Sequence, residues 1–260
     1  MFNQIRQILG YRHAIRNIAV RDLKLRYSNS MLGIVWSFFN PLLMTLVYTV
    51  VFTFMLRDSG ILKYPVYILA GLLPWNFFNL AALGAISVVT ANGHLIGRLY
   101  FPREILPISV VASNTVNFLI ALVLLFIFIL IYQVPLTLYA LWLPVIIVIQ
   151  IILSIGVGLF LSAIHVFFRD TQQIMEVLLL AWFFVTPILY PLERIRPVTR
   201  PFVLLLNPLA ALIVNYRNIL YQGAPPDLGV LAVTCAEALL ALTLGFAVFR
   251  RLSPSFAEEL

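Results

Sequence analysis

Charged residues are scarce in this chain. Aspartate, glutamate, lysine and arginine make up only 10% of its 260 residues, whereas 62% are hydrophobic. Soluble domains carry about 25% charged and about 45 to 50% apolar residues, so this composition excludes a water-soluble protein and a disordered chain. A single cysteine, Cys235, excludes a disulfide scaffold. The sequence therefore indicates an all-α polytopic membrane protein.

Catalytic and metal-binding patterns are also lacking. The three histidines lie far apart, and the ten acidic residues are scattered. The HExxH, GxSxG, CxxC and Walker patterns do not occur. We therefore predict that the chain is not an enzyme and that it contains neither a metal site nor an ATP site.

Long charge-free stretches predict six membrane-spanning helices. An α-helix rises about 1.5 Å per residue, so about 20 apolar residues cross the hydrocarbon layer. A break at residues 133–135 and Pro144 divides the longest stretch into two spans, and Pro74 predicts a kink inside the second span. The predicted spans are 34–56, 65–90, 107–132, 142–166, 174–190 and 228–249.

The basic residues predict the orientation of these spans. The net charge of +7 comes from residues beside the spans, which favours a membrane surface over nucleic acid as the partner. With the N-terminus in the cytoplasm, eleven basic residues are cytoplasmic and six are external, so we predict that both termini are inside. Four external arginines form an exception within one segment: Arg194, Arg196, Arg200 and Arg217.

That segment, residues 192–227, is too apolar for an ordinary external loop. Asn207-Pro208 interrupts it, because a residue before proline disfavours the helical conformation. We predict two half-helices that meet at this dipeptide and dip back into the membrane. An interfacial loop with some helix is the alternative.

Residues 1–33 show apolar side chains at mixed three- and four-residue spacing among arginines. This pattern predicts an amphipathic helix in the cytoplasmic interface, although an orientation signal alone would also explain the arginines. No internal repeat is evident, so residues 1–260 are predicted to form a single transmembrane domain.

The spans contain little that could power transport. Glu237 is the one ionisable residue well inside a span, and a structural hydrogen bond to Thr234 or Thr243 is its favoured interpretation. The chain therefore needs an external motor. Aromatic side chains are abundant at 13%, and rings inside spans could line a path for a glycan or simply pack between helices. The candidates are Trp75, Phe77, Phe78, Trp182, Phe183 and Phe184.

Short fragments in a fixed order carry a family resemblance over nearly the whole chain. The fragments are Arg21-Asp22-Leu23-Lys24-Leu25-Arg26-Tyr27, Ser30-Met31-Leu32-Gly33 with Trp36, Asn40-Pro41-Leu42, Gly71-Leu72-Leu73-Pro74-Trp75, Leu95-Ile96, Phe101-Pro102-Arg103-Glu104-Ile105-Leu106-Pro107, Phe167-Phe168-Arg169-Asp170, Thr186-Pro187-Ile188, and Asn207-Pro208-Leu209 with Tyr216-Arg217. With them the chain resembles the membrane subunits of ABC exporters that move lipid-linked polysaccharides, such as O-antigen, capsule-like glycans and teichoic acids.

The resemblance implies an inner-membrane permease that forms a homodimer and binds two cytoplasmic ABC ATPase subunits, which hold ATP and Mg. The loop from about Asn92 to Arg103 resembles the coupling helix that docks on the ATPase. Residues 168–172 are a second candidate contact, unless Arg169 and Asp170 are only an ion pair and a helix cap. The implied coupling residues are Leu95, Ile96, Leu99, Tyr100, Phe101, Arg103, Arg169 and Asp170.

The resemblance also implies where substrate enters and leaves. A polyprenyl-diphosphate-linked glycan would meet the basic N-terminal helix and the turn after it, and Asn207 and Pro208 would close the external end. Plain attraction of the basic residues to anionic lipid explains them equally well. The implied entrance residues are Arg21, Lys24, Arg26, Leu32 and Gly33.

Two other functions stay open at this point. An ABC exporter permease for a drug, a lipid or another small molecule is one alternative, and a membrane enzyme acting on a polyprenyl phosphate is a remote one.

Overall fold

The computed structural model describes residues 10–27, 33–51, 61–93 and 101–259, and all regular structure in these ranges is helical. The helices are α2 (Arg12–Tyr27), η1 (Gly33–Val35), α3 (Trp36–Val50), α4 (Tyr64–Ile86), α5 (Val88–Ala91), α7 (Ile105–Ile131), η3 (Leu138–Trp142), α8 (Leu143–Phe167), α9 (Thr171–Val185), η4 (Leu192–Arg194), α10 (Arg200–Leu206), α11 (Pro208–Arg217), η5 (Asn218–Gln222), α12 (Leu228–Leu252), η6 (Ser253–Ser255) and α13 (Phe256–Glu259).

Four helical segments in the described part of the chain are long and apolar enough to cross a membrane: Tyr64–Ile86, Ile105–Ile131, Leu138–Phe167 and Leu228–Ser255. They correspond to the predicted second, third, fourth and sixth spans. A fifth crossing results if the bent pair α10 and α11 with η5 counts as one span. The total of six spans stays a prediction.

The predicted first and fifth spans are shorter helices. α3 and α9 each contain 15 residues, and the end of the predicted span 34–56 lies outside the described residues. Helix α9 stops at Val185, five residues before the predicted end of the fifth span at residue 190. Thr186 is extended, with φ −81° and ψ 132°, since the following Pro187 disfavours a helical residue before it.

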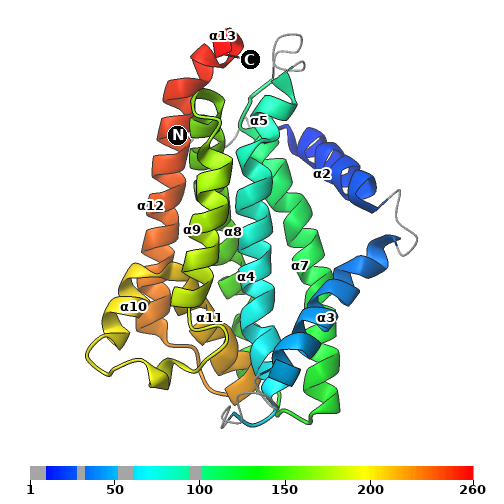
Figure 1. Ribbon diagram of the computed structural model, residues 1–260, viewed down its shortest axis with the longest axis vertical. Coiled ribbons are helices and arrows are strands. Elements are labelled where there is room, and N and C mark those ends of the chain that lie inside the picture. The colour runs from blue at the N-terminus through cyan, green and yellow to red at the C-terminus, as the bar shows by residue number, and fades with distance from the viewer. Residues whose placement is uncertain (1–9, 28–32, 52–60, 94–100, 260) are drawn as a thin grey trace.

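The long helices form a bundle around α4, with α7, α8 and α9 beside it and α3 crossing its lower part (Figure 1). Helix α4 is apolar apart from a few polar side chains such as Asn76 and Asn79, and 78% of its most apolar stretch is buried, as expected for a central helix. Helix α12 lies on the outside against α8, and only 22% of its corresponding stretch is buried. Thus the rest of the chain leaves most of this stretch of α12 uncovered.

Small residues set the distance between α8 and α12. A Cβ atom on Gly156 would collide with the backbone of Ala241 and Leu242, and one on Gly245 would collide with the Gly156 carbonyl oxygen. Small residues permit such close approach of helices in membranes. The α8–α12 contact therefore depends on these two glycines.

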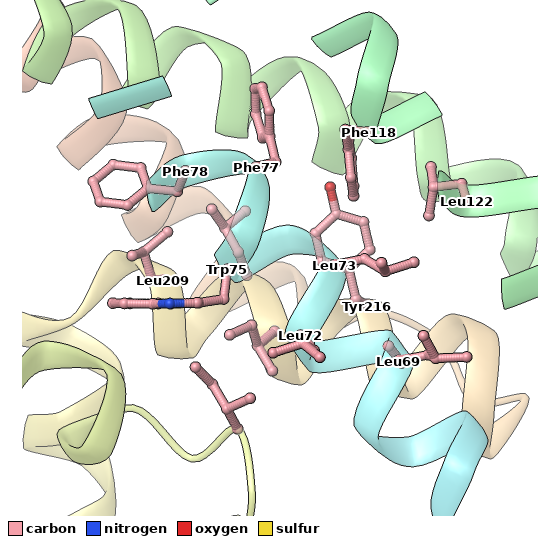
Figure 2. Packing of buried hydrophobic residues seen from close by; sticks show 14 of the residues in the cluster. Leu69, Leu72, Leu73, Trp75, Phe77, Phe78, Phe118, Leu122, Leu209 and Tyr216 are labelled. Atoms are coloured by element: carbon pink, nitrogen blue, oxygen red, sulfur yellow. The ribbon is translucent and has the colours of Figure 1, made fainter. Parts of the chain in front are cut away.

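Helix α4 continues through Pro74 without a break. Proline weakens a helix because it removes a hydrogen bond. Beside it, Gln150 of α8 donates from Nε2 to the Pro74 carbonyl oxygen at 2.7 Å and accepts from the Tyr216 hydroxyl at 2.8 Å. Figure 2 shows Tyr216 beside Phe118, and their ring centroids are 6.2 Å apart. Gln150 therefore joins α8, α4 and α11 within the apolar core.

A second apolar cluster lies at the end of the bundle where α5 and α13 are found (Figure 1). Phe256 of α13 packs edge-on against Phe249 of α12, with ring centroids 5.3 Å apart. Arg103, just before α7, donates to the Ser253 carbonyl oxygen and lies 6.0 Å from the centre of the Phe256 ring. The start of α7 and the C-terminal segment are thus held together.

Candidate functional site

A groove of about 540 Å³ lies between α3, α4 and α9. Its wall is mostly apolar, but four polar side chains interrupt it: Asn40, Asn76, Asn79 and Glu176. Amide groups both donate and accept hydrogen bonds, which suits a ligand that carries hydroxyl groups. The other lining residues are Met44, Tyr48, Leu72, Trp75, Leu80, Leu83, Leu179, Leu180, Phe183 and Phe184.

The groove includes three of the six aromatic residues that the sequence suggested for a transport path: Trp75, Phe183 and Phe184. Trp75 and Phe183 meet at a ring-centroid distance of 5.6 Å, whereas Phe184 is 60% exposed. The Trp75 and Phe183 rings meet edge to face and are both buried, so they help to form the groove wall, while Phe184 is the exposed ring.

The other three rings pack against other helices of the bundle. Phe77 stacks on Phe118 at 5.2 Å, and Phe78 contacts Trp182 edge-on at 5.5 Å. Figure 2 shows Leu209 between Phe78 and Trp75. These contacts provide a packing role for Phe77, Phe78 and Trp182, while a role in lining a channel stays a prediction.

Sequence reasoning did not identify the three asparagines as a group. Asn76 and Asn79 interrupt the apolar stretch of α4, and with Leu72 and Leu83 they follow a spacing of three or four residues, which places them on one helix face. That spacing was the available signal. Asn40 joins them only because α3 packs against α4.

Asn207 organises the corner between α10 and α11, which are bent by 108° to one another across this residue. Its Oδ1 atom accepts from the Ala210 backbone at 3.1 Å, which caps α11, and from Trp182 Nε1 at 3.0 Å. Its Nδ2 atom donates to the Thr186 hydroxyl at 3.0 Å. Two short helices thus meet at Asn207-Pro208 as predicted, and one side chain connects their corner to the end of α9, while their return into the membrane stays a prediction.

Arg217, at the end of α11, is buried in the bundle. Its Nη1 and Nη2 atoms donate to the carbonyl oxygens of Pro187 and Ile188, each at 2.5 Å, and its guanidinium lies 3.6 Å from the centre of the Tyr67 ring. A Cβ atom at Gly71 would come within 2.7 Å of Nη2. Gly71 therefore makes room for the arginine.

Two tyrosines of α4 hold the chain that follows α9. The Tyr64 hydroxyl donates to the Leu189 carbonyl oxygen at 3.1 Å, and the Tyr67 hydroxyl donates to that of Tyr190 at 2.8 Å. With Arg217, they attach residues 187–190 to the central helix. This end of the bundle is thus held together by α4, α11 and the segment after α9.

The predicted coupling region is described only in part. Leu95, Ile96, Leu99 and Tyr100 lie outside the described residues. Phe101 is half-buried and packs against the second apolar cluster, next to Arg103.

Arg169 and Asp170, the second predicted coupling contact, are both exposed. Asp170 occupies the N-cap position of α9, but its side chain accepts no capping hydrogen bond, and it forms no ion pair with Arg169. The simple explanation of this dipeptide as a cap and an ion pair therefore has no support.

The predicted entrance residues are also only partly described. Arg21 of α2 donates to the Asn92 side chain at 3.3 Å and lies 3.7 Å from the Asp22 carboxylate, which brings the N-terminal helix next to α5. Gly33 has a φ of 51°, a left-handed conformation that favours glycine. Lys24 and Arg26 belong to α2, but their side chains, like Leu32, lie outside the described residues.

Glu237 of α12 has a buried Oε2 atom with no hydrogen-bond partner in the described part of the structure. Thr234 and Thr243 donate instead to the backbone carbonyl oxygens of Val230 and Leu240. The suggested bond to these threonines is therefore not found. Among residues 10–27, 33–51, 61–93 and 101–259, no group of three or more His, Cys, Asp and Glu side chains could hold a metal ion.

Comparisons with known proteins agree with this membrane architecture. Residues 13–221 match the family described as ABC-2 type transporter. The O-antigen export system permease protein RfbA of Myxococcus xanthus is 35% identical over 100% of both chains. A protein with the same designation from Klebsiella pneumoniae is 31% identical over 94% of this chain and 93% of its own. The polysialic acid transport protein KpsM of Escherichia coli is 24% identical over 91% of this chain and 92% of its own.

Proposed function

Because the chain belongs to the ABC-2 type transporter family, we propose that it is the permease subunit of an ATP-driven exporter of lipid-linked polysaccharide. The observation that carries this proposal is the similarity along the entire chain to permeases designated for O-antigen export. Permease subunits of this family are transport components, and a separate subunit hydrolyses ATP. The protein is a multi-pass protein of the inner membrane.

The proposed topology has six spans, with α3 and α9 as the first and fifth and both termini in the cytoplasm. It is supported by the bundle, in which α5 and the end of α12 lie at one end while α10 and α11 lie at the other (Figure 1). The loop after α5 and the C-terminal segment would then face the ATPase. The half-helices around Asn207 and Pro208 would close the external end.

The proposed transport path is the groove between α3, α4 and α9. The outer faces of α3 and α9 carry exposed apolar side chains, among them Val47, at 50% exposure, and Val177, at 67%. Two copies of the chain that face each other across these helices would enclose both grooves in one channel. Asparagine amides would exchange hydrogen bonds with glycan hydroxyls, and aromatic faces would contact sugar rings.

The energy source in this proposal is a pair of cytoplasmic ABC ATPase subunits that bind ATP and Mg. They would dock on residues 92–103 and on Arg169 and Asp170. The polyprenyl-diphosphate head of the substrate would approach the basic helix α2 near Arg21, because guanidinium groups bind phosphate oxygens through paired hydrogen bonds.

Depletion of the protein in its host tests which substrate it exports. We expect lipid-linked polysaccharide to accumulate on the cytoplasmic side, because synthesis continues while export stops, and expression of the intact chain should restore export. Unchanged surface polysaccharide together with loss of export of a small molecule would instead indicate a drug or lipid exporter.

Purification in mild detergent tests whether the protein binds an ATPase subunit. An ATPase subunit should co-purify in equal amount, and the permease should change its ATP hydrolysis rate. Chemical conversion of a polyprenyl phosphate by the isolated chain would contradict the proposal, because it would identify an enzyme.

A further inference from the structure

The arginines between α9 and α12 depart from the charge distribution of the other loops, and the structure divides them into two kinds. Arg217 is buried and serves the packing described above. Arg194 and Arg196 are exposed, and Arg200 is half-buried at the first residue of α10. The packing of the bundle therefore does not account for this outer cluster of positive charge.

A second groove, of about 390 Å³, lies between η4, α10 and the first turns of α12. Small-molecule sites occupy about 300 to 1,000 Å³, so the groove is large enough for part of a lipid. It shares no lining residue with the transport groove, and Figure 1 shows α10 and α3 on different sides of the bundle. Its lining residues are Leu192, Arg200, Pro201, Leu204, Leu205, Gly229, Val230 and Val233.

Among the described residues that line this groove, Arg200 is the only charged one, and two hydrogen bonds hold its side chain in place. Its Nε atom donates to the Ile195 carbonyl oxygen at 2.9 Å, and Nη2 donates to that of Glu193 at 2.5 Å. Within the described residues no carboxylate pairs with Arg200 or Arg196. Arg200 lies in the groove wall, and Arg196 precedes it by one turn, since the Arg196 carbonyl oxygen accepts from the Arg200 backbone N–H at 3.2 Å.

Apolar side chains around the groove are turned outward. Val198 is 78% exposed, Phe202 60% and Leu206 76%. A helix with an exposed apolar surface and arginines at its end is typical of the boundary between hydrocarbon and headgroups. At that depth an acyl chain would meet the groove and a phosphate would meet the arginines.

We infer that this groove holds one acyl chain of an anionic phospholipid, whose phosphate is bound by Arg200 and Arg196. The charge of the arginines complements an anionic headgroup, and the apolar wall suits a hydrocarbon chain. The occupant is a lipid of the surrounding bilayer rather than cargo, because the groove is separate from the transport groove. The inference goes beyond the proposed function and does not depend on it.

A larger side chain at Gly229, which lines the groove, can test whether the groove must be empty for lipid to bind. A Cβ atom at this position would meet only the Asp227 Oδ1 atom, at 3.4 Å, which is an ordinary contact. A Gly229→Leu substitution therefore places a side chain in the groove without displacing backbone. Val233→Trp fills the groove from another position, and Ala247→Leu adds a similar volume at an exposed site near the other end of α12.

The test uses the full-length chain in nanodiscs and spin-labelled lipids, whose immobilised fraction measures association. We expect spin-labelled phosphatidylglycerol to associate more strongly than spin-labelled phosphatidylcholine, by about fivefold for each basic residue near the headgroup. Gly229→Leu and Val233→Trp should reduce association of both lipids. Arg196→Gln should lower only the preference for phosphatidylglycerol, and Ala247→Leu should change neither value.

Equal phosphatidylglycerol association in the wild type and both groove-filling variants, each with an unchanged unfolding temperature, would overturn the inference. Displacement of the label by polyprenyl phosphate but not by phosphatidylglycerol would overturn it in favour of a cargo site. Displacement by inorganic phosphate alone would leave an anion site without a lipid. None of these outcomes bears on polysaccharide export, which depletion in the host tests separately.

Discussion

At the scale of single residues, the apolar bundle contains a few buried polar side chains whose hydrogen bonds cross from one helix to another. Gln150 and Arg217 each contact two other segments of the chain, and Asn207 bonds to the end of α9. A buried polar group that loses its partner in an apolar medium is strongly unfavourable. These residues therefore determine which arrangement of the helices is stable.

Asn207→Ala should destabilise the protein by about 1 to 3 kcal/mol, because it removes the cap of α11 and the bonds to Trp182 and Thr186. Asn207→Asp keeps acceptors for the Ala210 N–H and Trp182 but cannot donate to Thr186, so we expect a smaller loss. Thermal unfolding in detergent would measure both. Equal stability of Asn207→Ala and the wild type would show that the corner does not depend on this side chain.

Gly71→Ala should also destabilise the protein, by about 1 to 3 kcal/mol, because the new methyl group displaces the Arg217 guanidinium. Gly229→Ala is the matched control, since its methyl group meets no close neighbour. Unfolding temperatures of the two variants provide the comparison. Similar temperatures would mean that Arg217 adjusts without loss.

At the scale of elements, the contact between α8 and α12 depends on close backbone approach rather than on large side chains. Gly156 and Gly245 face each other where the two helices meet. Apolar side chains gain little from meeting each other in lipid, so packing between helices must supply the attraction. Helix α12 would otherwise be held mainly by its ends.

Gly245→Val should separate α12 from α8 and lower stability by about 1 to 3 kcal/mol or more, because the backbone of Gly156 cannot move aside cheaply. Ala247→Val places the same side chain on the exposed face of α12 and should have little effect. Unfolding temperature and protease sensitivity of the C-terminal segment would report the difference. Equal unfolding temperatures and protease sensitivities for the two variants would show that the close contact between α8 and α12 is not needed for stability.

At the scale of the whole molecule, the two ends of the bundle carry different features. One end holds the half-helices, the Arg217 contacts and the second groove, and the other holds Phe101, Arg103 and the C-terminal segment. The groove of asparagines and aromatic rings lies between α3, α4 and α9. A movement at the end with Phe101 could therefore reach the other end through α4 and α9.

Phe101→Asp and Leu99→Asp should weaken the ATPase complex and abolish coupling, because a charge replaces an apolar contact on the predicted coupling loop. Leu136→Asp, at an exposed position in the loop after α7, is the control and should leave the complex intact. Co-purification of the ATPase and its stimulated hydrolysis rate are the measurements. Intact, stimulated complexes of both loop variants would show that the ATPase docks elsewhere.

The sequence by itself determined the membrane character of this protein, the long apolar helices and the breaks at residues 133–135 and Asn207. These features depend on local composition and on the backbone restrictions of proline, which neighbouring residues in the chain reveal. The end of α9 at Val185 follows from the same rule, although apolar composition alone suggested a longer span.

Only the tertiary structure decided which polar side chains meet. Arg217 belongs to the segment predicted to lie outside the spans, but its side chain is buried in the bundle. Tyr67 and the carbonyl oxygens after α9 are its partners, and Gly71 leaves room for it. Asn40 joins two asparagines of α4 in the same way, through the packing of α3. Such contacts join residues far apart in the chain, so local spacing carries no signal for them.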